Sequence, residues 1–268
     1  MEVGIMGEDL NQRNKEEQAT IDRFDSAIVG EAEASDEAVA TMSGLGKVIN
    51  IIIAPTLALR AIKAKPTILW AMIIVPLFSL LYYLLFWDAY EVQMIKLLEL
   101  QFAAQGMELT REMLDLQLKI QRVVAPVGSF VGTYLGAVIA AFFYFIIGKI
   151  MKKEVTFKQT FSLLMHVSII SSLIFVMHML LTLILGESNI MAPMTSAASL
   201  LPSSMDGSLL SYLLIPIEIF TLWYMYVLYL GLNIVCNYSK KAAGITVVVT
   251  LMISMLLGAS SYIIAALT

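Results

Sequence analysis

Cysteine, histidine and charged residues are all scarce in this chain of 268 residues. It has one cysteine, two histidines and 14% charged residues. Cys236 alone cannot form a disulfide or a thiolate metal cluster within one chain. The sequence also has no Walker-type phosphate loop, no His-Glu-x-x-His pair and no Gly-x-Ser-x-Gly elbow. These absences predict a protein that is not an enzyme and that binds neither a cofactor nor a metal.

Long apolar runs dominate the chain, in which 59% of the residues are hydrophobic. The five runs cover residues 68–87, 124–150, 161–185, 209–233 and 245–267. A hydrocarbon core of about 30 Å needs about 20 helical residues, and backbone groups inside lipid must pair within the chain. A soluble helical bundle would need polar residues at every third or fourth position, and the runs lack them. The sequence therefore predicts an all-α polytopic membrane protein with five transmembrane helices.

The basic residues near the runs predict the orientation of the chain, because positive side chains are retained on the cytoplasmic side. The connection 187–208 and the tail after Leu267 have no lysine or arginine, whereas lysines and arginines precede the first run and lie between runs two and three and between runs four and five. We therefore expect an integral membrane protein, in the cell inner membrane if bacterial, with a cytoplasmic N-terminus and an extracytoplasmic C-terminus. The residues expected to face anionic lipid headgroups are Lys47, Arg60, Lys63, Lys65, Lys152 and Lys153.

The residues before the first run differ from the rest of the chain. Residues 1–42 hold eleven acidic residues against three basic ones, so we expect a disordered cytoplasmic tail over 1–43. Residues 44–66 predict an amphipathic interfacial segment that Pro55 breaks into two short helices. Two interpretations of this segment remain, a simple lead-in to the first span and a contact with anionic lipid. The transmembrane domain then covers 67–268.

The connection 88–122 predicts an extracytoplasmic helical hairpin. Gly106 separates its two arms, and Thr110 is the expected N-cap of the second arm. The apolar side chains of such a hairpin must pack against another surface. The candidates are its own second arm, the outer loop before the fourth span and a second protomer.

Small residues recur every fourth position in the second run, at Gly128, Gly132, Gly136 and Ala140. Stacked small residues let two helix backbones approach closely where lipid supplies no hydrophobic force. The spacing therefore predicts a helix crossing, within the chain or at the seam of a homo-oligomer. The fifth run repeats the pattern more weakly at Ser254 and Gly258.

Three ionisable residues lie inside the runs, Glu218, His178 and His166, and such residues often mark function. At about 1.5 Å per residue, Glu218 and His178 share a depth in the outer third, where Ser79 and Thr133 also fall. A small polar pocket is therefore expected there. Glu218 could be hydrogen-bonded to His178 or to hydroxyls as a packing feature, or it could form a proton or cation site.

Several segments occur in an order that resembles the bacterial members of the YIP family, the Ypt/Rab-interacting proteins with five spans. They are Ile-Ile-Ile-Ala-Pro-Thr at 51–56, Ala-Pro-Val-Gly at 125–128, Thr-Phe-Lys-Gln-Thr-Phe-Ser at 156–162, Ile-Glu-Ile-Phe-Thr-Leu-Trp at 217–223 and Ser-Lys-Lys at 239–241. The resemblance implies an acidic cytoplasmic tail, five helices and an outer C-terminus, and Glu218 matches an acidic residue of the family's fourth span. Eukaryotic relatives are associated with Rab-type GTPases, but their Asp-Leu-x-Gly-Pro motif is replaced here by Ala54-Pro55.

Two functions are compatible with these features. In the first, the protein is a non-catalytic membrane organiser or adaptor that binds membrane lipids, or a protein partner through its acidic tail or outer hairpin, and binds no nucleic acid. In the second, it is a small channel or carrier for protons, ions or a solute, centred on Glu218 and His178. We favour the first, because the runs show no clear inverted repeat or broken-helix pair of the kind many carriers contain.

Overall fold

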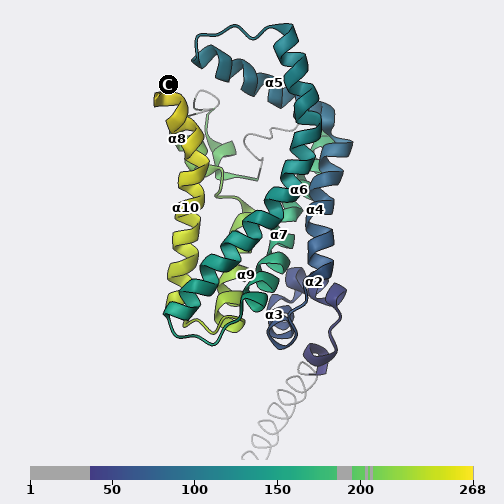
Figure 1. The fold of residues 1–268 in the computed structure, drawn as a ribbon, viewed down its shortest axis with the longest axis vertical. Coiled ribbons are helices and arrows are strands. Elements are labelled where there is room, and N and C mark those ends of the chain that lie inside the picture. The colour runs from purple at the N-terminus through teal and green to yellow at the C-terminus, as the bar shows by residue number, and fades with distance from the viewer. Residues whose placement is uncertain (1–36, 186–194, 203–204, 206–207, 268) are drawn as a thin grey trace, which may run out of the picture. The chain divides into compact units, whose positions relative to one another are not determined.

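The computed structural model describes residues 37–185, 195–202, 205 and 208–267. The chain divides into two compact units, Met1–Met42 and Ser43–Thr268, and the description below concerns the second. The predicted acidic tail lies largely outside the described residues. Within Ser43–Thr268 the described chain is built from helices joined by short turns (Figure 1). The all-α class predicted from the sequence is confirmed.

The segment before the first span folds as two short helices, α2 (Gly44–Ile53) and α3 (Pro55–Ala64). The Ser43 hydroxyl caps α2 by accepting a hydrogen bond from the Gly46 amide at 3.0 Å. Pro55 takes the first position of α3, so the predicted break is confirmed. Both helices pack on the bundle, because Ile51, Leu59 and Ile62 are fully buried and contacts run from α2 to α7 and from α3 to α9.

The next three helices are α4 (Leu69–Leu85), α5 (Trp87–Ala104) and α6 (Arg111–Ile150). The axes of α4 and α5 differ by 81° across a short break. The chain turns at Gly106, where φ is +65°, and Thr110 caps α6 by accepting from the Met113 amide at 3.3 Å, as predicted. The helix that starts at this cap continues without interruption through the predicted second span. One 40-residue helix therefore joins the predicted hairpin arm to the span.

The remaining elements are α7 (Phe157–Leu185), the short 3-10 helix η1 (Ala197–Leu200), α8 (Leu209–Leu214), α9 (Ile219–Ile234) and α10 (Lys240–Leu267). The predicted fourth span, 209–233, is not a single helix. It is divided at 215–218, where Pro216 lacks the amide that would continue the ladder of hydrogen bonds. The sequence showed no clear broken-helix pair, and the structure breaks this run at Pro216.

In Ser43–Thr268, α4, α6 and α7 pack on one another, α9 packs between α7 and α10, and α8 packs on α10. A hydrogen bond between the Tyr144 hydroxyl and the Thr250 hydroxyl, at 2.8 Å, joins α6 to α10. The turn 151–156 between α6 and α7 and the turn 235–239 between α9 and α10 lie at the same end as α2 and α3 (Figure 1). We call this end, with its flanking lysines and arginines, the basic end.

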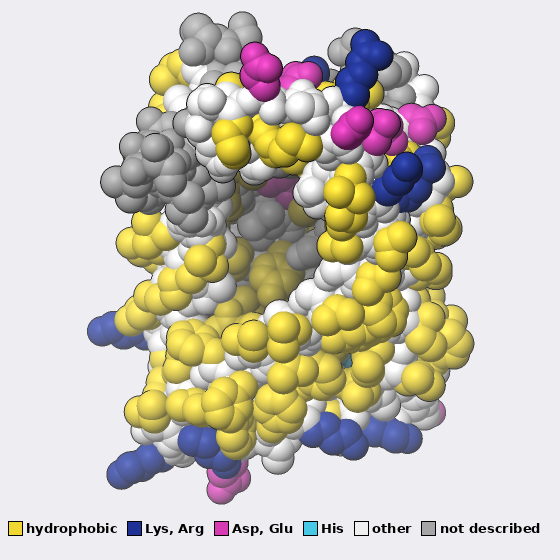
Figure 2. All heavy atoms as spheres, turned by 45° about the horizontal axis from the view of Figure 1, so that its top comes forward, with side chains coloured by type: hydrophobic (Ala, Val, Ile, Leu, Met, Phe, Trp, Pro, Cys, Tyr) yellow, Lys and Arg dark blue, Asp and Glu magenta, His cyan; other side chains and the backbone are white. Residues whose placement is uncertain are grey.

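Three described helices are long and apolar enough to cross a membrane, α6, α7 and α10, and the bent pair of α4 and α5 would add a fourth. The prediction of five spans is therefore met only in part. The helix α4 has 17 residues and α9 has 16, so each reaches only about 25 Å at 1.5 Å per residue. Figure 2 shows hydrophobic side chains covering the face between the basic end and an opposite end of mixed charge.

Candidate functional site

Glu218 lies at the break between α8 and α9 and is 2% exposed. It is the N-cap of α9, and its Oε2 accepts a hydrogen bond from the Thr221 amide at 2.9 Å. Its Oε1 accepts from the Thr195 hydroxyl at 2.8 Å. Both carboxyl oxygens are therefore occupied by neighbouring groups, at a helix N-terminus where the helix dipole would favour a negative charge.

A short segment, 195–199, supplies hydrogen-bond partners to the backbone of the broken helix. The Ser196 hydroxyl donates to the carbonyls of Leu214 and Ile215, each at 3.1 Å, and the Ala197 amide donates to the Ile217 carbonyl at 2.8 Å. Broken helices are tolerated in lipid only when the freed backbone groups find such partners. No pattern in the sequence marks this segment as the partner of the fourth run.

The structure describes the side chain of only one of the two histidines in the predicted polar site. His166, on α7, is buried, and its Nδ1 lies 2.8 Å from the Ser162 carbonyl one helical turn earlier. The side chain of His178 lies outside the described part of the chain. Its predicted pairing with Glu218 stays a prediction, while the described partners of Glu218 are Thr195 and Thr221.

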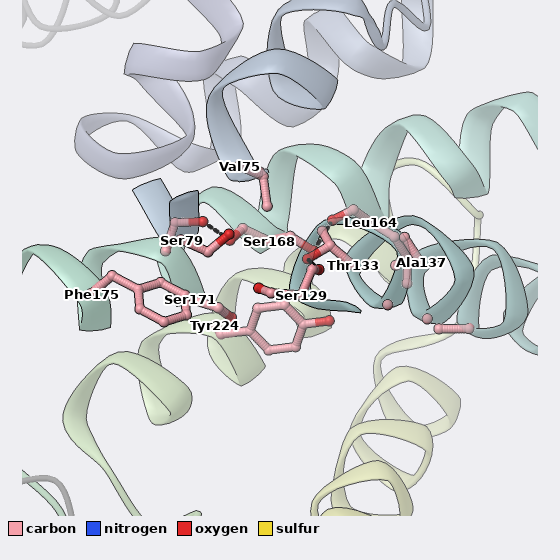
Figure 3. Close-up of a pocket in the computed structure, with 14 residues that line it drawn as sticks. Val75, Ser79, Ser129, Thr133, Ala137, Leu164, Ser168, Ser171, Phe175 and Tyr224 are labelled. Atoms are coloured by element: carbon pink, nitrogen blue, oxygen red, sulfur yellow. Dashed lines mark hydrogen bonds between the residues drawn. The ribbon is translucent and has the colours of Figure 1, made fainter. Parts of the chain in front are cut away.

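A cavity of about 310 Å³ lies among α4, α6, α7 and α9 (Figure 3). Ser79 and Thr133, two of the hydroxyl residues expected near one layer, both line it, whereas Glu218 does not. The lining residues carry hydroxyl or apolar side chains and no charge. They are Val75, Ser79, Ser129, Gly132, Thr133, Gly136, Ala137, Ala140, Leu164, Ser168, Ser171, Ser172, Phe175 and Tyr224.

The predicted small-residue ridge lies beside this cavity and not at a helix crossing. A Cβ added at Gly128, Gly132 or Gly136 would have nothing within 4 Å among the described residues. The predicted close packing within the chain is therefore wrong at these three positions, since no described helix approaches them closely. Ala140 is half-buried and packs against the core. A contact with a second protomer stays a prediction.

Close helix packing occurs instead at Gly231 on α9, where a Cβ would lie 2.3 Å from Leu163 Cδ1 on α7. A lone glycine in an apolar run gives no periodic signal, so the sequence reasoning missed it as a packing site. Of the two weaker positions, Gly258 faces α8, with the Tyr212 carbonyl oxygen 3.6 Å from its would-be Cβ. The Ser254 hydroxyl donates to the Leu251 carbonyl at 2.7 Å, within its own helix.

The basic end combines buried polar contacts with exposed cations. Lys47, predicted to face lipid, is 1% exposed, and its ammonium donates to the Lys65 carbonyl and to Thr67 Oγ1. That prediction was wrong, because α2 turns Lys47 inward under the bundle. Burial, together with the charge of Lys65, lowers the pKa of Lys47 below its ordinary value of 10.5.

The other predicted lipid-facing cations point outward, except that Lys153 is half-buried. Lys63 also donates to Asn237 Oδ1 at 2.6 Å, and Asn237 Nδ2 donates to the Glu154 carbonyl at 3.2 Å. These two bonds tie α3 to both turns of the basic end. The exposed cations of this end are Arg60, Lys63, Lys65, Lys149, Lys152, Lys158, Lys240 and Lys241.

Metal chemistry has little support in the described part of the chain, which contains no group of three His, Cys, Asp or Glu side chains placed to hold an ion. Cys236 is buried beside the basic end, and burial raises the pKa of its thiol to about 12. A thiol with such a pKa is a poor nucleophile and a poor metal ligand at neutral pH.

The helices, their apolar exterior and the uncharged cavity define the class of the molecule as an integral membrane protein. Residues 49–262 match the Yip1 domain, so the chain belongs to that family and the resemblance to YIP proteins is confirmed. The chain is also similar to the membrane protein YknW of Bacillus subtilis (strain 168), with 30% identity over 141 residues. That match covers 53% of this chain and 59% of YknW, and so leaves a large part of both proteins unmatched. No solved structure matches the chain.

Proposed function

We propose that this Yip1-domain protein is a non-catalytic membrane organiser whose basic end gathers anionic lipid headgroups. The observation that carries the proposal is the cluster of eight exposed cations at one end of the bundle, among which Glu154 is the one described acid of the two turns. Juxtamembrane cations attract anionic lipid by about 1 kcal/mol each near the surface. The buried α2 and α3 fix part of this cluster relative to the spans.

The proposed topology has five passes, with the basic end in the cytoplasm. The fourth pass is the broken pair α8 and α9, and the first is α4 with its bent continuation. Retention of positive loops on the cytoplasmic side supports this orientation. A partner protein would then meet the extracytoplasmic turn between α5 and α6 or the acidic tail.

Cysteine labelling tests the topology. In a Cys236→Ser background, Gln105→Cys should react with an impermeant maleimide on intact cells, whereas Lys158→Cys should react only after permeabilisation. Both positions are exposed, so accessibility within the fold does not bias the comparison. The reverse labelling pattern would invert the orientation and place the cations on the wrong side.

Lipid selectivity tests the function. The variant Arg60→Gln/Lys65→Gln/Lys158→Gln removes three exposed cations whose side chains make no described hydrogen bond. At about 1 kcal/mol per cation, its preference for spin-labelled anionic over zwitterionic lipid should fall up to about a hundredfold at low salt. The matched control Lys96→Gln/Arg111→Gln/Lys119→Gln removes three exposed cations from the opposite end and should keep the preference. Equal losses in both variants would contradict a headgroup site at the basic end.

One observation keeps the carrier function as a second candidate. The helix α9 begins at a break with a buried carboxylate, and broken helices form the substrate sites of many carriers. Against it, both oxygens of Glu218 are occupied and the residue does not line the cavity. Proton flux in liposomes that disappears in Glu218→Gln would support the carrier, and the absence of flux in the wild type would leave the organiser.

A further inference from the structure

The cavity among α4, α6, α7 and α9 lies about half the thickness of a bilayer's hydrocarbon core from the basic end. Tyr224 is ten residues from Ile234, where α9 ends at the basic end, and Ser168 is eleven residues from Phe157, where α7 begins. At 1.5 Å per residue both lie about 15 to 17 Å from that end, half the thickness of a hydrocarbon core of about 30 Å. A phospholipid headgroup, which is anchored at the interface, does not reach this depth.

The cavity is open along the small-residue face of α6. Gly132 and Gly136 line it, belong to the exposed residues and have nothing within 4 Å of a would-be Cβ. Their neighbours Leu135 and Ile139 are 57% and 61% exposed, as expected of a lipid-facing surface. The entrance therefore faces hydrocarbon, and a molecule dissolved in the bilayer can enter sideways.

Three hydroxyls in the cavity have no hydrogen-bond partner among the described residues. Those of Ser79, Thr133, Ser168 and Ser172 each donate to a carbonyl of their own helix, at 2.8 to 3.1 Å. The hydroxyls of Ser129, Ser171 and Tyr224 make no hydrogen bond within the described part of the chain, and Figure 3 shows all three residues lining the cavity. A hydroxyl without a partner in an apolar environment is costly, so an occupant that accepts hydrogen bonds would be favoured.

The size and charge of the cavity further limit which molecules it could bind. A volume of about 310 Å³ is at the small end of ligand pockets. The lining carries no charge, and the aromatic side chains of Phe175 and Tyr224 supply flat walls. These features favour an occupant that is small, uncharged, flat and able to accept hydrogen bonds.

We propose that this cavity binds the carbonyl-bearing head of a neutral membrane lipid of the quinone type. The two ring carbonyls accept hydrogen bonds from the hydroxyls of Ser129, Ser171 and Tyr224, and the tail lies along Gly132 and Gly136. This site is separate from the basic end, so a negative result for one proposal would not contradict the other.

Photolabelling tests the site with a decyl-substituted benzoquinone that carries a diazirine in its tail, on the full chain in lipid nanodiscs. Labelling of wild-type peptides from α6, α7 and α9 should be displaced by excess unlabelled quinone. Gly132→Leu fills the entrance and should reduce this displaceable labelling at least about tenfold. The matched control is Gly128→Leu, on the same open face of α6 but outside the cavity lining, which should label like the wild type.

A second variant removes the donors and keeps the shape of the cavity. Ser129→Ala/Ser171→Ala/Tyr224→Phe should lose at least about tenfold in labelling, as expected when several hydrogen bonds are lost. Far-UV circular dichroism checks that each variant is folded. Equal labelling of Gly132→Leu and Gly128→Leu would overturn the proposal. So would equal, displaceable labelling by a diazirine-bearing decane, because the cavity would then select hydrocarbon and not carbonyl groups.

Discussion

Replacing Gly231 by alanine should loosen the contact between α7 and α9. The new Cβ would lie 2.3 Å from Leu163 Cδ1 and 3.0 Å from Cδ2. Leu163 is fully buried, so moving its side chain away from the clash would displace its packed neighbours. Overpacking of this kind costs about 1–3 kcal/mol, against a gain of up to about 1 kcal/mol in helix propensity.

The matched control is Gly128→Ala, which makes the same chemical change in a helix where nothing lies within 4 Å. The propensity gain is common to both variants, so the difference between their unfolding free energies isolates the packing term. We expect Gly231→Ala to be less stable than Gly128→Ala by about 1–3 kcal/mol. The assay is unfolding by SDS in mixed micelles, followed by far-UV circular dichroism.

A double-mutant cycle with Leu163→Ala sharpens this prediction. That change alone leaves a hole and costs about 2–5 kcal/mol. Because the Cβ of alanine at position 231 then occupies part of the hole, the double variant should be more stable than the sum of the two single changes implies, by at least about 0.5 kcal/mol. Additive effects, or equal stability of Gly231→Ala and Gly128→Ala, would refute the close approach of the two helices.

Three further predictions concern buried polar groups. Glu218→Ala removes the cap of α9 and leaves the Thr195 hydroxyl without its acceptor. The unfolding free energy of this variant should therefore fall by about 1–3 kcal/mol. Glu218→Gln keeps an acceptor oxygen, so its unfolding free energy should fall less. Cys236 should resist maleimide at pH 7.5 in the folded protein and react once SDS unfolds it, because the thiol is buried and its pKa is about 12. Fast labelling of the folded protein would contradict this prediction. Lys47 has a pKa below its ordinary value of 10.5 because of burial and the charge of Lys65, so the unfolded chain binds more protons in the window between the two values. The unfolding free energy should therefore rise with pH as 10.5 is approached, and Lys47→Met should lose that part of the slope.

Local sequence signals were sufficient to predict the two helices at the basic end and the start of the helix that contains the second span. Pro55 lacks an amide hydrogen, so it must begin a helix if it is in one, and the break before α3 follows. Thr110 followed by acidic residues gives a cap that the structure contains. Such features depend on residues within one helical turn, which a single sequence displays.

The hydrogen-bond partners of the buried polar side chains could not be predicted from local sequence signals. Glu218 was recognised as unusual, but its partner Thr195 lies 23 residues away, in a connection with no periodic pattern. Lys47 has the position of a lipid-facing cation, and only the packing of α2 under the bundle turns it toward the Lys65 carbonyl. In both cases the deciding neighbour is distant in sequence and near in space.

The scarcity of charge and the long apolar runs by themselves determined the class of this protein, because no fold in water can hide that much apolar surface in continuous segments. Tertiary structure decided which small residues face a neighbour and which face open space. Gly128, Gly132 and Gly136 share the spacing of a helix crossing, yet the close approach occurs at Gly231 and a cavity lies beside Gly132 and Gly136. Spacing determines which residues share a face of a helix. What that face meets depends on the path of the other helices, and in lipid that path is set by packing and hydrogen bonds between distant residues.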